Sequence, residues 1–358
     1  MTYSSPLQHE HLKLGAKLTD FGGWMMPLVY KEGTIAEHKA VRSGVGLFDV
    51  THLGKITVEG PGAEAALDRA LPGKIAKLRP GRAGYNLVLN SSGGVVDDIF
   101  VYRKDDGFLV VPNASNMDAV LTYVESLAGP DVTVRDDRLR WAILALTGPG
   151  ARDLIARLIP GAEAMKMHDF RYFELNGSEM LVARTGYTGE VTYELLPAWD
   201  EAPAIWNLLL EEGRAAGIRP AGLGARDTLR LEMGYPLHGH ELSATINPLE
   251  AGLAWVVDWE KDFFGKEALE ELRERGTGRK LVGLVGSEGR IPRMGHPVLN
   301  GPEQVGEVTS GNFSPTLGVP IALAFVSSEH AEPGTELSIG IRGKQLPVTV
   351  VAPPFIKS

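Results

Sequence analysis

The stretch GYNLVLNSSGGVVDDIFVYRKDDGFLVVP, residues 84–112, contains three apolar runs separated by short polar segments. The runs cover residues 84–90, 95–103 and 107–112, and SSGG separates the first two. Apolar runs of this length joined by Gly- and Ser-rich turns are typical of consecutive antiparallel strands. We therefore predict a β-meander over residues 84–112.

Helical and strand patterns alternate on both sides of this meander. A second strong hairpin is predicted over residues 178–197, around the TGYTGE segment at 185–190. From about Arg279 onward, short alternating strands recur between Gly and Pro turns, which predicts a separate small all-β domain, a barrel or a sandwich. Helical spacing is present at residues 34–42, 63–71, 116–126, 151–159, 204–217 and in the segment 219–234, after its Gly-rich loop.

Composition narrows the possible classes of protein. A chain of 358 residues is long enough for two or three domains. Its formal net charge of -9, without a basic block, weighs against nucleic-acid binding. The absence of cysteine excludes disulfides, thiol nucleophiles and thiolate metal sites. We found no secretory signal and no apolar run of membrane-spanning length, so we expect a cytoplasmic protein without a membrane partner.

Two adjacent carboxylates, Asp97 and Asp98, interrupt the apolar strand 95–103. Because side chains alternate across a strand, one of them points to each face, and Asp98 shares its face with Phe100 and Tyr102. An unpaired carboxylate beside apolar surface is costly. Two interpretations follow: the pair bonds the SSGG turn at the end of the strand, or one carboxylate faces a ligand.

Two further charged positions have both a structural and a functional interpretation. Glu194, after the TGYTGE segment, is either a solvated edge-strand residue or a ligand contact. Arg226 follows a Gly-rich loop near a helix start, where it would suit an anion. The alternative is an intrahelical ion pair of Arg226 or Arg230 with Asp227 or Glu232. Phosphate-loop, nucleophile-elbow and zinc-helix motifs are absent, and GLGARD at 222–227 is only a partial dinucleotide-loop match.

Taken together, several blocks resemble the glycine cleavage T-protein family, the aminomethyltransferases. The resemblance covers nearly the whole chain in order. It is carried by FGGWMMPL (21–28), GLFDVTHLG (46–54), GGVVDDIFVY (93–102), RTGYTGEVTYEL (184–195), RPAGLGARDTLRLE (219–232), NPLEAGLAWVV (247–257) and VGEVTSGNFSPTLG (305–318).

The resemblance implies an α+β fold of three domains around a central folate channel. Two α+β domains with antiparallel sheets precede a C-terminal all-β barrel or jelly-roll-like domain. The implied first domain is discontinuous, 1–50 with about 137–245. The second comprises about 51–136 with about 246–278, and the third about 279–358.

The resemblance also implies a reaction, its partners and its residues. The family takes an aminomethyl group from the lipoyl arm of the H-protein and releases ammonia. It passes the one-carbon unit to tetrahydrofolate, giving 5,10-methylenetetrahydrofolate, and it needs no metal. Asp98 matches the family's catalytic carboxylate. The positions implied to contact tetrahydrofolate are Leu53, Tyr85, Tyr102, Asn113, Tyr187, Glu194, Arg226 and, as a weaker match, Tyr235.

Two related classes fit the sequence less well. A non-catalytic folate-binding paralogue linked to iron–sulfur cluster assembly carries a cysteine in its K-G-C-[YF]-x-G-Q-E stretch. The corresponding segment here is RTGYTGE, at 184–190, without cysteine. Dimethylglycine- and sarcosine-type oxidases need a flavin domain in addition, for which 358 residues leave no room.

Overall fold

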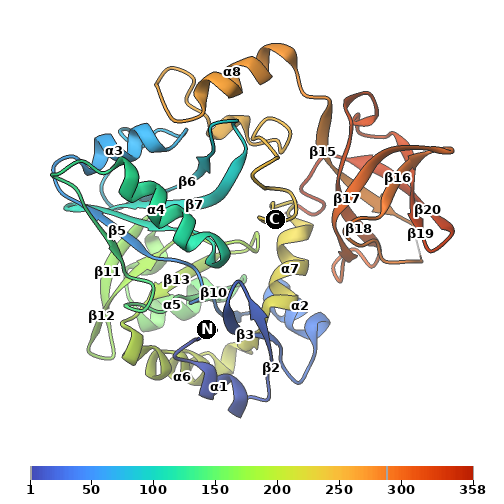
Figure 1. The fold of residues 1–358 in the computed structure, drawn as a ribbon. Coiled ribbons are helices and arrows are strands. Elements are labelled where there is room, and N and C mark those ends of the chain that lie inside the picture. The colour runs from blue at the N-terminus through green and yellow to red at the C-terminus, as the bar shows by residue number, and fades with distance from the viewer. Residues whose placement is uncertain (1, 288, 358) are drawn as a thin grey trace. The chain divides into compact units, whose positions relative to one another are not determined.

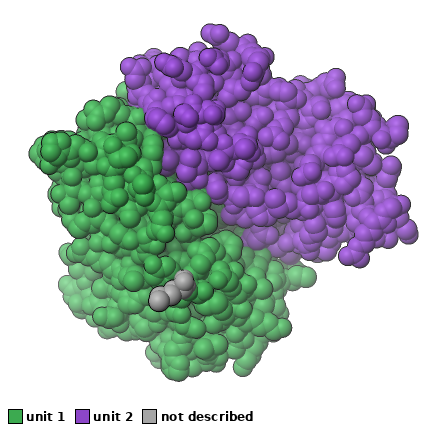
Figure 2. Space-filling model, in the orientation of Figure 1, with its two compact units in different colours: residues 1–86, 98–226 green, residues 87–97, 227–358 purple. Residues whose placement is uncertain are grey.

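A computed structural model describes residues 2–287 and 289–357 of the chain. The chain divides into two compact units, which Figure 2 shows in different colours. One unit comprises residues 1–86 and 98–226, and the other comprises 87–97 and 227–358. Within the described residues, no helix combines the length and the apolar character that a membrane crossing requires. The three-domain borders expected from the sequence remain a prediction.

Three sheets account for the strands up to residue 221 (Figure 1). The predicted meander is present and forms one side of a five-stranded sheet of order β6-β7-β8-β5-β9. A six-stranded sheet has the order β11-β12-β13-β10-β4-β14, and a three-stranded sheet the order β1-β3-β2. The bounds are β1 Tyr3–Ser4, β2 Lys17–Phe21, β3 Trp24–Val29, β4 Gly46–Asp49, β5 Ile56–Glu59, β6 Arg82–Leu89, β7 Val95–Arg103, β8 Gly107–Val111, β9 Thr133–Asp136, β10 Leu144–Thr147, β11 Phe170–Leu175, β12 Ser178–Ala183, β13 Thr192–Leu196 and β14 Arg219–Ala221.

Helices cover the six-stranded sheet because their apolar residues recur at helical spacing. In α6, Ala202–Glu212, the buried positions are Ala202, Ile205, Trp206 and Leu209, the i, i+3, i+4, i+7 pattern of an amphipathic helix. They join one core with α5, Ala151–Leu158, and with inward residues of β10 and β13. The other helices are α1 Gln8–Lys13, α2 Thr34–Ser43, α3 Ala63–Ala70, α4 Met117–Leu127, α7 Leu223–Glu232 and α8 Lys266–Arg275.

The C-terminal strands close into a six-stranded barrel of order β15-β18-β17-β16-β19-β20. Its interior is filled by alternating apolar side chains such as Val282, Leu284, Ala322 and Ala324, as expected for a small closed barrel. This confirms the all-β unit predicted from about Arg279. The bounds are β15 Arg279–Gly286, β16 Pro297–Asn300, β17 Glu303–Phe313, β18 Pro320–Ser327, β19 Glu336–Ile341 and β20 Lys344–Val351.

The β2–β3 hairpin and helix α8 are among the elements that were not predicted. The β2–β3 hairpin turns through Gly22 and Gly23, both with positive φ (58° and 82°), a conformation that glycine adopts without strain. Its strands carry Pro27 and mixed polar residues, so their alternation is weak. Helix α8 is mostly charged, and Leu269 is its one fully buried side chain, so its apolar face is too narrow to give a periodic signal.

Candidate functional site

Asp98 lies on β7 and is held by side chains from the neighbouring strands of the meander. Tyr85 Oη on β6 donates a hydrogen bond to Asp98 Oδ2 at 3.2 Å. Asn113 Nδ2, just after β8, donates to Asp98 Oδ1 at 2.9 Å. Asp98 is partly buried, whereas Asp97 on the opposite face is fully buried. Asp98 is therefore oriented by Tyr85 and Asn113, and our alternative that the aspartates serve only the SSGG turn does not describe it.

The protonation of Asp98 is tuned by two opposing effects. Burial disfavours the charged carboxylate and raises its pKa, while the hydrogen bonds from Tyr85 and Asn113 stabilise the charge and lower it. Burial is the larger effect, and the pKa of Asp98 rises from 3.8 to about 6. A carboxyl group with a pKa close to neutrality can both take up and return a proton under ordinary conditions.

A backbone hydrogen bond attaches the loop that carries Leu53 to the segment that leads into Asn113, next to Asp98. Gly54 N donates to the carbonyl of Pro112, the residue before Asn113, at 2.8 Å. A side chain at Gly54 would meet Pro112 Cγ at 2.6 Å and Met117 Sδ at 2.4 Å, so only glycine permits this approach. Leu53 itself stays partly exposed. The loop thereby presents an apolar side chain next to the segment that holds Asp98.

Buried polar groups behind this loop fix its shape. Asp49 Oδ1 accepts a hydrogen bond from Thr51 N at 2.9 Å. Ile143 N donates to Thr51 Oγ1 at 3.1 Å, and Lys55 Nζ donates to the Thr51 carbonyl at 2.6 Å. Asp49, Thr51 and Lys55 are each at most 2% exposed. The loop is therefore preorganised by buried groups of the protein itself.

Glu194 lies at the centre of a sheet, which corrects our interpretation of it as an edge-strand residue. Its strand β13 pairs with β10 on one side and β12 on the other. The side chain is only 9% exposed, and Oε2 accepts hydrogen bonds from Thr185 Oγ1 and, at 3.4 Å, from Tyr102 Oη. Burial and the Glu194 charge raise the pKa of Tyr102, so its hydroxyl remains a donor. We call Tyr102, Thr185 and Glu194 the Glu194 cluster.

Arg226 and Tyr187 form a second charged element of the same unit. The guanidinium carbon of Arg226 lies 4.8 Å from the Tyr187 ring centroid, a cation–π arrangement. Burial lowers the pKa of Arg226, while Tyr187 and Glu194 raise it. Within the described residues, no carboxylate lies at ion-pair distance from Arg226. The predicted intrahelical pair instead belongs to Arg230, which meets Asp227 at 2.8 Å.

Sequence reasoning missed two side chains here. Thr185, which bonds Glu194, belongs to the RTGYTGE block but was not singled out. His52, before Leu53, is 3% exposed, and its Nδ1 has no hydrogen-bond partner among the described residues. Burial, helped by the charge of Arg226, lowers the pKa of His52 to about 3, so the ring is neutral. A histidine inside the GLFDVTHLG block, in the short segment between two predicted strands, was the signal available for it.

Tyr235, the weakest of the implied contacts, belongs to the second unit. Its backbone N donates to the carbonyl of Arg230 at 3.0 Å, and its own carbonyl accepts from Arg230 Nη1 at 3.1 Å. These contacts explain how the turn after α7 is held. The implied folate contact of Tyr235 remains a prediction.

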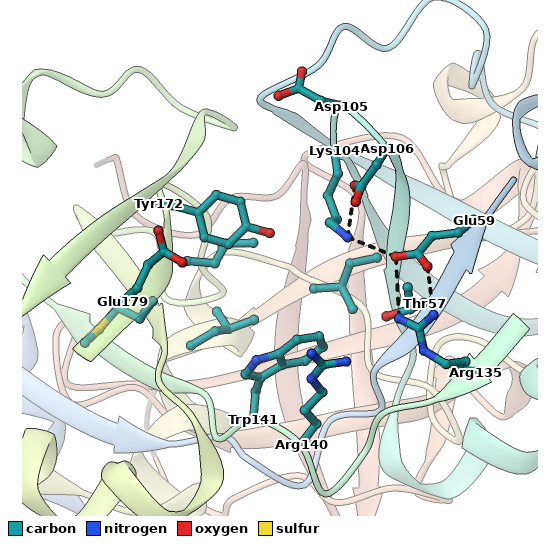
Figure 3. A pocket seen from close by; sticks show the side chains of 14 residues that line it. Thr57, Glu59, Lys104, Asp105, Asp106, Arg135, Arg140, Trp141, Tyr172 and Glu179 are labelled. Carbon is teal, nitrogen blue, oxygen red and sulfur yellow. Dashed lines mark hydrogen bonds and ion pairs between the residues drawn. The ribbon is translucent and has the colours of Figure 1, made fainter. Parts of the chain in front are cut away.

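A cavity of about 630 Å³ lies in the first unit (Figure 3). Its lining comes from both large sheets, from Thr57 and Leu109 on one and from Tyr172 and Leu196 on the other. None of the residues implied by the resemblance lines it. It is therefore a feature that the sequence analysis did not predict.

Comparison with known proteins covers nearly the full chain. The model of the GCVT N-terminal domain matches residues 7–261, and that of the glycine cleavage T-protein C-terminal barrel domain matches residues 279–357. An aminomethyltransferase of Streptomyces avermitilis is 48% identical over 356 residues, covering 97% of this chain and 95% of the relative. One of Mycobacterium tuberculosis (strain H37Rv) is 45% identical over 354 residues, covering 98% and 96%.

A solved structure shows the same fold. The crystal structure of glycine cleavage system aminomethyltransferase T from Bartonella henselae superposes with a TM-score of 0.92 at 34% identity. The match covers 99% of this chain and 98% of that one. The predicted fold class, α+β with a C-terminal barrel, is confirmed by this likeness.

Proposed function

The chain belongs to the glycine cleavage T-protein family, as an aminomethyltransferase of that system, and from this premise we propose its substrates and the roles of its residues. The donor is the aminomethyl group on the lipoyl arm of the H-protein, and the acceptor is tetrahydrofolate. The products are ammonia, 5,10-methylenetetrahydrofolate and the dihydrolipoyl H-protein. Action in the cytoplasm belongs to the same proposal.

The observation that carries the proposal is the state of Asp98. Its carboxylate is oriented by Tyr85 and Asn113, and burial brings its pKa to about 6. In the reaction, the carbon–nitrogen bond to ammonia breaks, and the carbon leaves sulfur to bond N5 and N10 of the folate. The two folate nitrogens lose two protons, one of which ends on the leaving ammonia and the other on the lipoyl sulfur, and an iminium-type cation develops at the transferred carbon. A fixed carboxylate suits both needs, since it can accept a proton and stabilise the positive charge.

Glu194 is proposed to bind the edge of the pterin. The N3–H and 2-amino groups of a pterin form two parallel donors, which one carboxylate can accept together. Glu194 is buried but already ordered by Thr185 and Tyr102, so it needs little rearrangement to receive them. Apolar walls for the rings would come from the flat side chains of Tyr85, Tyr102 and Tyr187, and from Leu53.

Arg226 is proposed to act inside the site and not at the folate tail. Its guanidinium stacks on Tyr187 and lies within the field of Glu194. A partly buried guanidinium without a carboxylate partner needs an acceptor, and the carbonyl oxygen of a pterin is one. The charge of Arg226 helps to lower the pKa of His52. The His52 ring is therefore neutral and adds no second positive charge there.

A coupled assay tests the proposal. Aminomethylated H-protein and tetrahydrofolate are mixed with the enzyme, and ammonia and methylenetetrahydrofolate are measured together. We expect one ammonia for each methylenetetrahydrofolate formed. Tight folate binding without ammonia release above the rate without enzyme would instead indicate the non-catalytic alternative.

A further inference from the structure

The cavity of Figure 3 lies on the same sheet faces as the Glu194 cluster. On the five-stranded sheet, Tyr102 pairs directly with Leu109, which lines the cavity and in turn pairs with Thr57. Directly paired residues share a face of a sheet. The cavity therefore occupies the face that carries Tyr102 and lies one strand beyond it.

On the six-stranded sheet, too, the cavity lies on the face that carries a member of the Glu194 cluster. Leu196 lines the cavity two residues after Glu194 on β13, so both side chains point to the same face. Leu196 pairs with Leu181, and Leu181 pairs with Tyr172. The two sheets thus provide an apolar floor of leucines next to the Glu194 cluster. At about 630 Å³ the cavity has the size of a small-molecule site.

One wall of the cavity is charged but neutralises itself. Lys104 Nζ lies 3.3 Å from Glu59 Oε1 and 3.1 Å from Asp106 Oδ1. Arg135 Nη1 lies 2.7 Å from Glu59 Oε2. These groups bond one another across the right of the view in Figure 3. They close the cavity on that side and leave little charge for a ligand.

The other charged groups of the lining are available. Glu179 lies beside Tyr172 on the left of Figure 3 and has no ion pair among the described residues. Arg140 lies below, with its guanidinium carbon 4.8 Å from the centroid of the Trp141 ring. Its nearest carboxylate oxygen is Asp137 Oδ1 at 3.8 Å, a long contact. Apart from Asp105, at the top of the view in Figure 3, the cavity therefore offers one anion and one cation, with two aromatic rings and an apolar floor.

We propose that this cavity binds a free α-amino acid with an apolar side chain, as a site separate from that of folate. The ammonium group would meet the Glu179 carboxylate and the rings of Tyr172 and Trp141, a combination that suits cations. The carboxylate would meet the guanidinium of Arg140, which can bind it with two parallel hydrogen bonds. The side chain would pack on the leucine floor. The proposal does not depend on the folate chemistry.

L-Leucine is the probe, and its derivatives test each charge. Titration calorimetry on the full chain should give a dissociation constant on the order of 1 mM, since the charged groups are exposed and the ligand is small. N-acetyl-L-leucine lacks the ammonium group and L-leucinamide lacks the carboxylate. We expect each to bind at least about 10-fold more weakly. Equal binding of all three, or none up to about 20-fold above that constant, would overturn the proposal.

Matched variants locate the site. Glu179→Gln and Arg140→Gln should each weaken L-leucine binding at least about 10-fold. Arg171→Gln and Glu211→Gln are the controls, because Arg171 is exposed and pairs with Val182 outside the cavity lining, and Glu211 is exposed on α6, so both variants should bind as the unaltered protein does. Binding that persists in saturating tetrahydrofolate supports a separate site. Displacement by tetrahydrofolate, or unchanged binding in both cavity variants, would refute it, whatever the outcome of the ammonia assay.

Discussion

Asn113 Nδ2 donates to Asp98 twice, to the backbone carbonyl at 3.1 Å and to Oδ1 of the carboxylate at 2.9 Å. One amide group thus fixes both the strand and its side chain. Asn113 is in turn positioned by Pro112, whose carbonyl accepts from Gly54. The loop with Leu53 and the carboxylate of Asp98 are therefore parts of one rigid arrangement, and rigidity of this kind is what orientation of a reactive group requires.

Asp98→Asn should leave the fold intact and reduce the rate of methylenetetrahydrofolate formation at least about 10²-fold, the usual contribution of a positioned acid–base group. The amide retains the size of the carboxylate but cannot accept a proton. The measurement is the coupled ammonia assay at saturating substrates. Asp105→Asn, at an exposed position of the β7–β8 turn, is the matched control and should be fully active. Near-normal turnover of Asp98→Asn would remove Asp98 from its catalytic role.

The same substitution should stabilise the protein near neutral pH. Burial raises the pKa of Asp98 to about 6, above its unfolded value near 4, so the folded protein retains a proton that the unfolded chain has lost between these values. The unaltered protein should therefore lose stability through Asp98 as the pH rises from 4 to 6, and Asp98→Asn should not. By pH 7 the variant should gain about 1–3 kcal/mol, measured by urea unfolding. A difference independent of pH would show that this carboxylate is not destabilised by burial.

The sequence predicted Asp98 because alternation along 95–103 can be read locally. The buried position of Glu194 at the centre of a sheet could not be predicted in that way. The place of β13 between β10 and β12 depends on strands distant in sequence. Thr185 and His52 have the same explanation, because they contact the side chains of Tyr102 and Phe21, which lie on elements distant in sequence. Arg226 and Arg230 are one turn apart on one helix, and only the tertiary structure shows which of them pairs with Asp227.

Asn113→Ala should move the acid limb of the pH–rate profile upward. The Asn113 amide stabilises the charged form of Asp98, so its removal raises the pKa of that carboxyl further above 6. We expect the midpoint to rise by about one pH unit, the equivalent of one hydrogen bond to a charged group. Compared with the unaltered protein, the variant should therefore lose less turnover at pH 8.5 than at pH 6. Ser115→Ala, in the exposed turn nearby, should leave the midpoint in place. A uniform loss of rate at every pH would point to a packing defect and would contradict this account.

Glu194→Gln should weaken tetrahydrofolate binding without abolishing the fold. One accepting oxygen becomes an NH₂ donor that faces the donors of the pterin edge, while the other oxygen still accepts from Thr185 and Tyr102. Loss of a charged hydrogen bond costs about 1.5–3 kcal/mol, which is about 10- to 100-fold in affinity. Calorimetry with tetrahydrofolate measures this directly, and Glu174→Gln on the exposed hairpin is the matched control. Glu194→Asp, which keeps the charge but shortens the side chain, should recover part of the loss. Unchanged affinity of Glu194→Gln, with the control and the unaltered protein binding alike, would place the pterin edge elsewhere.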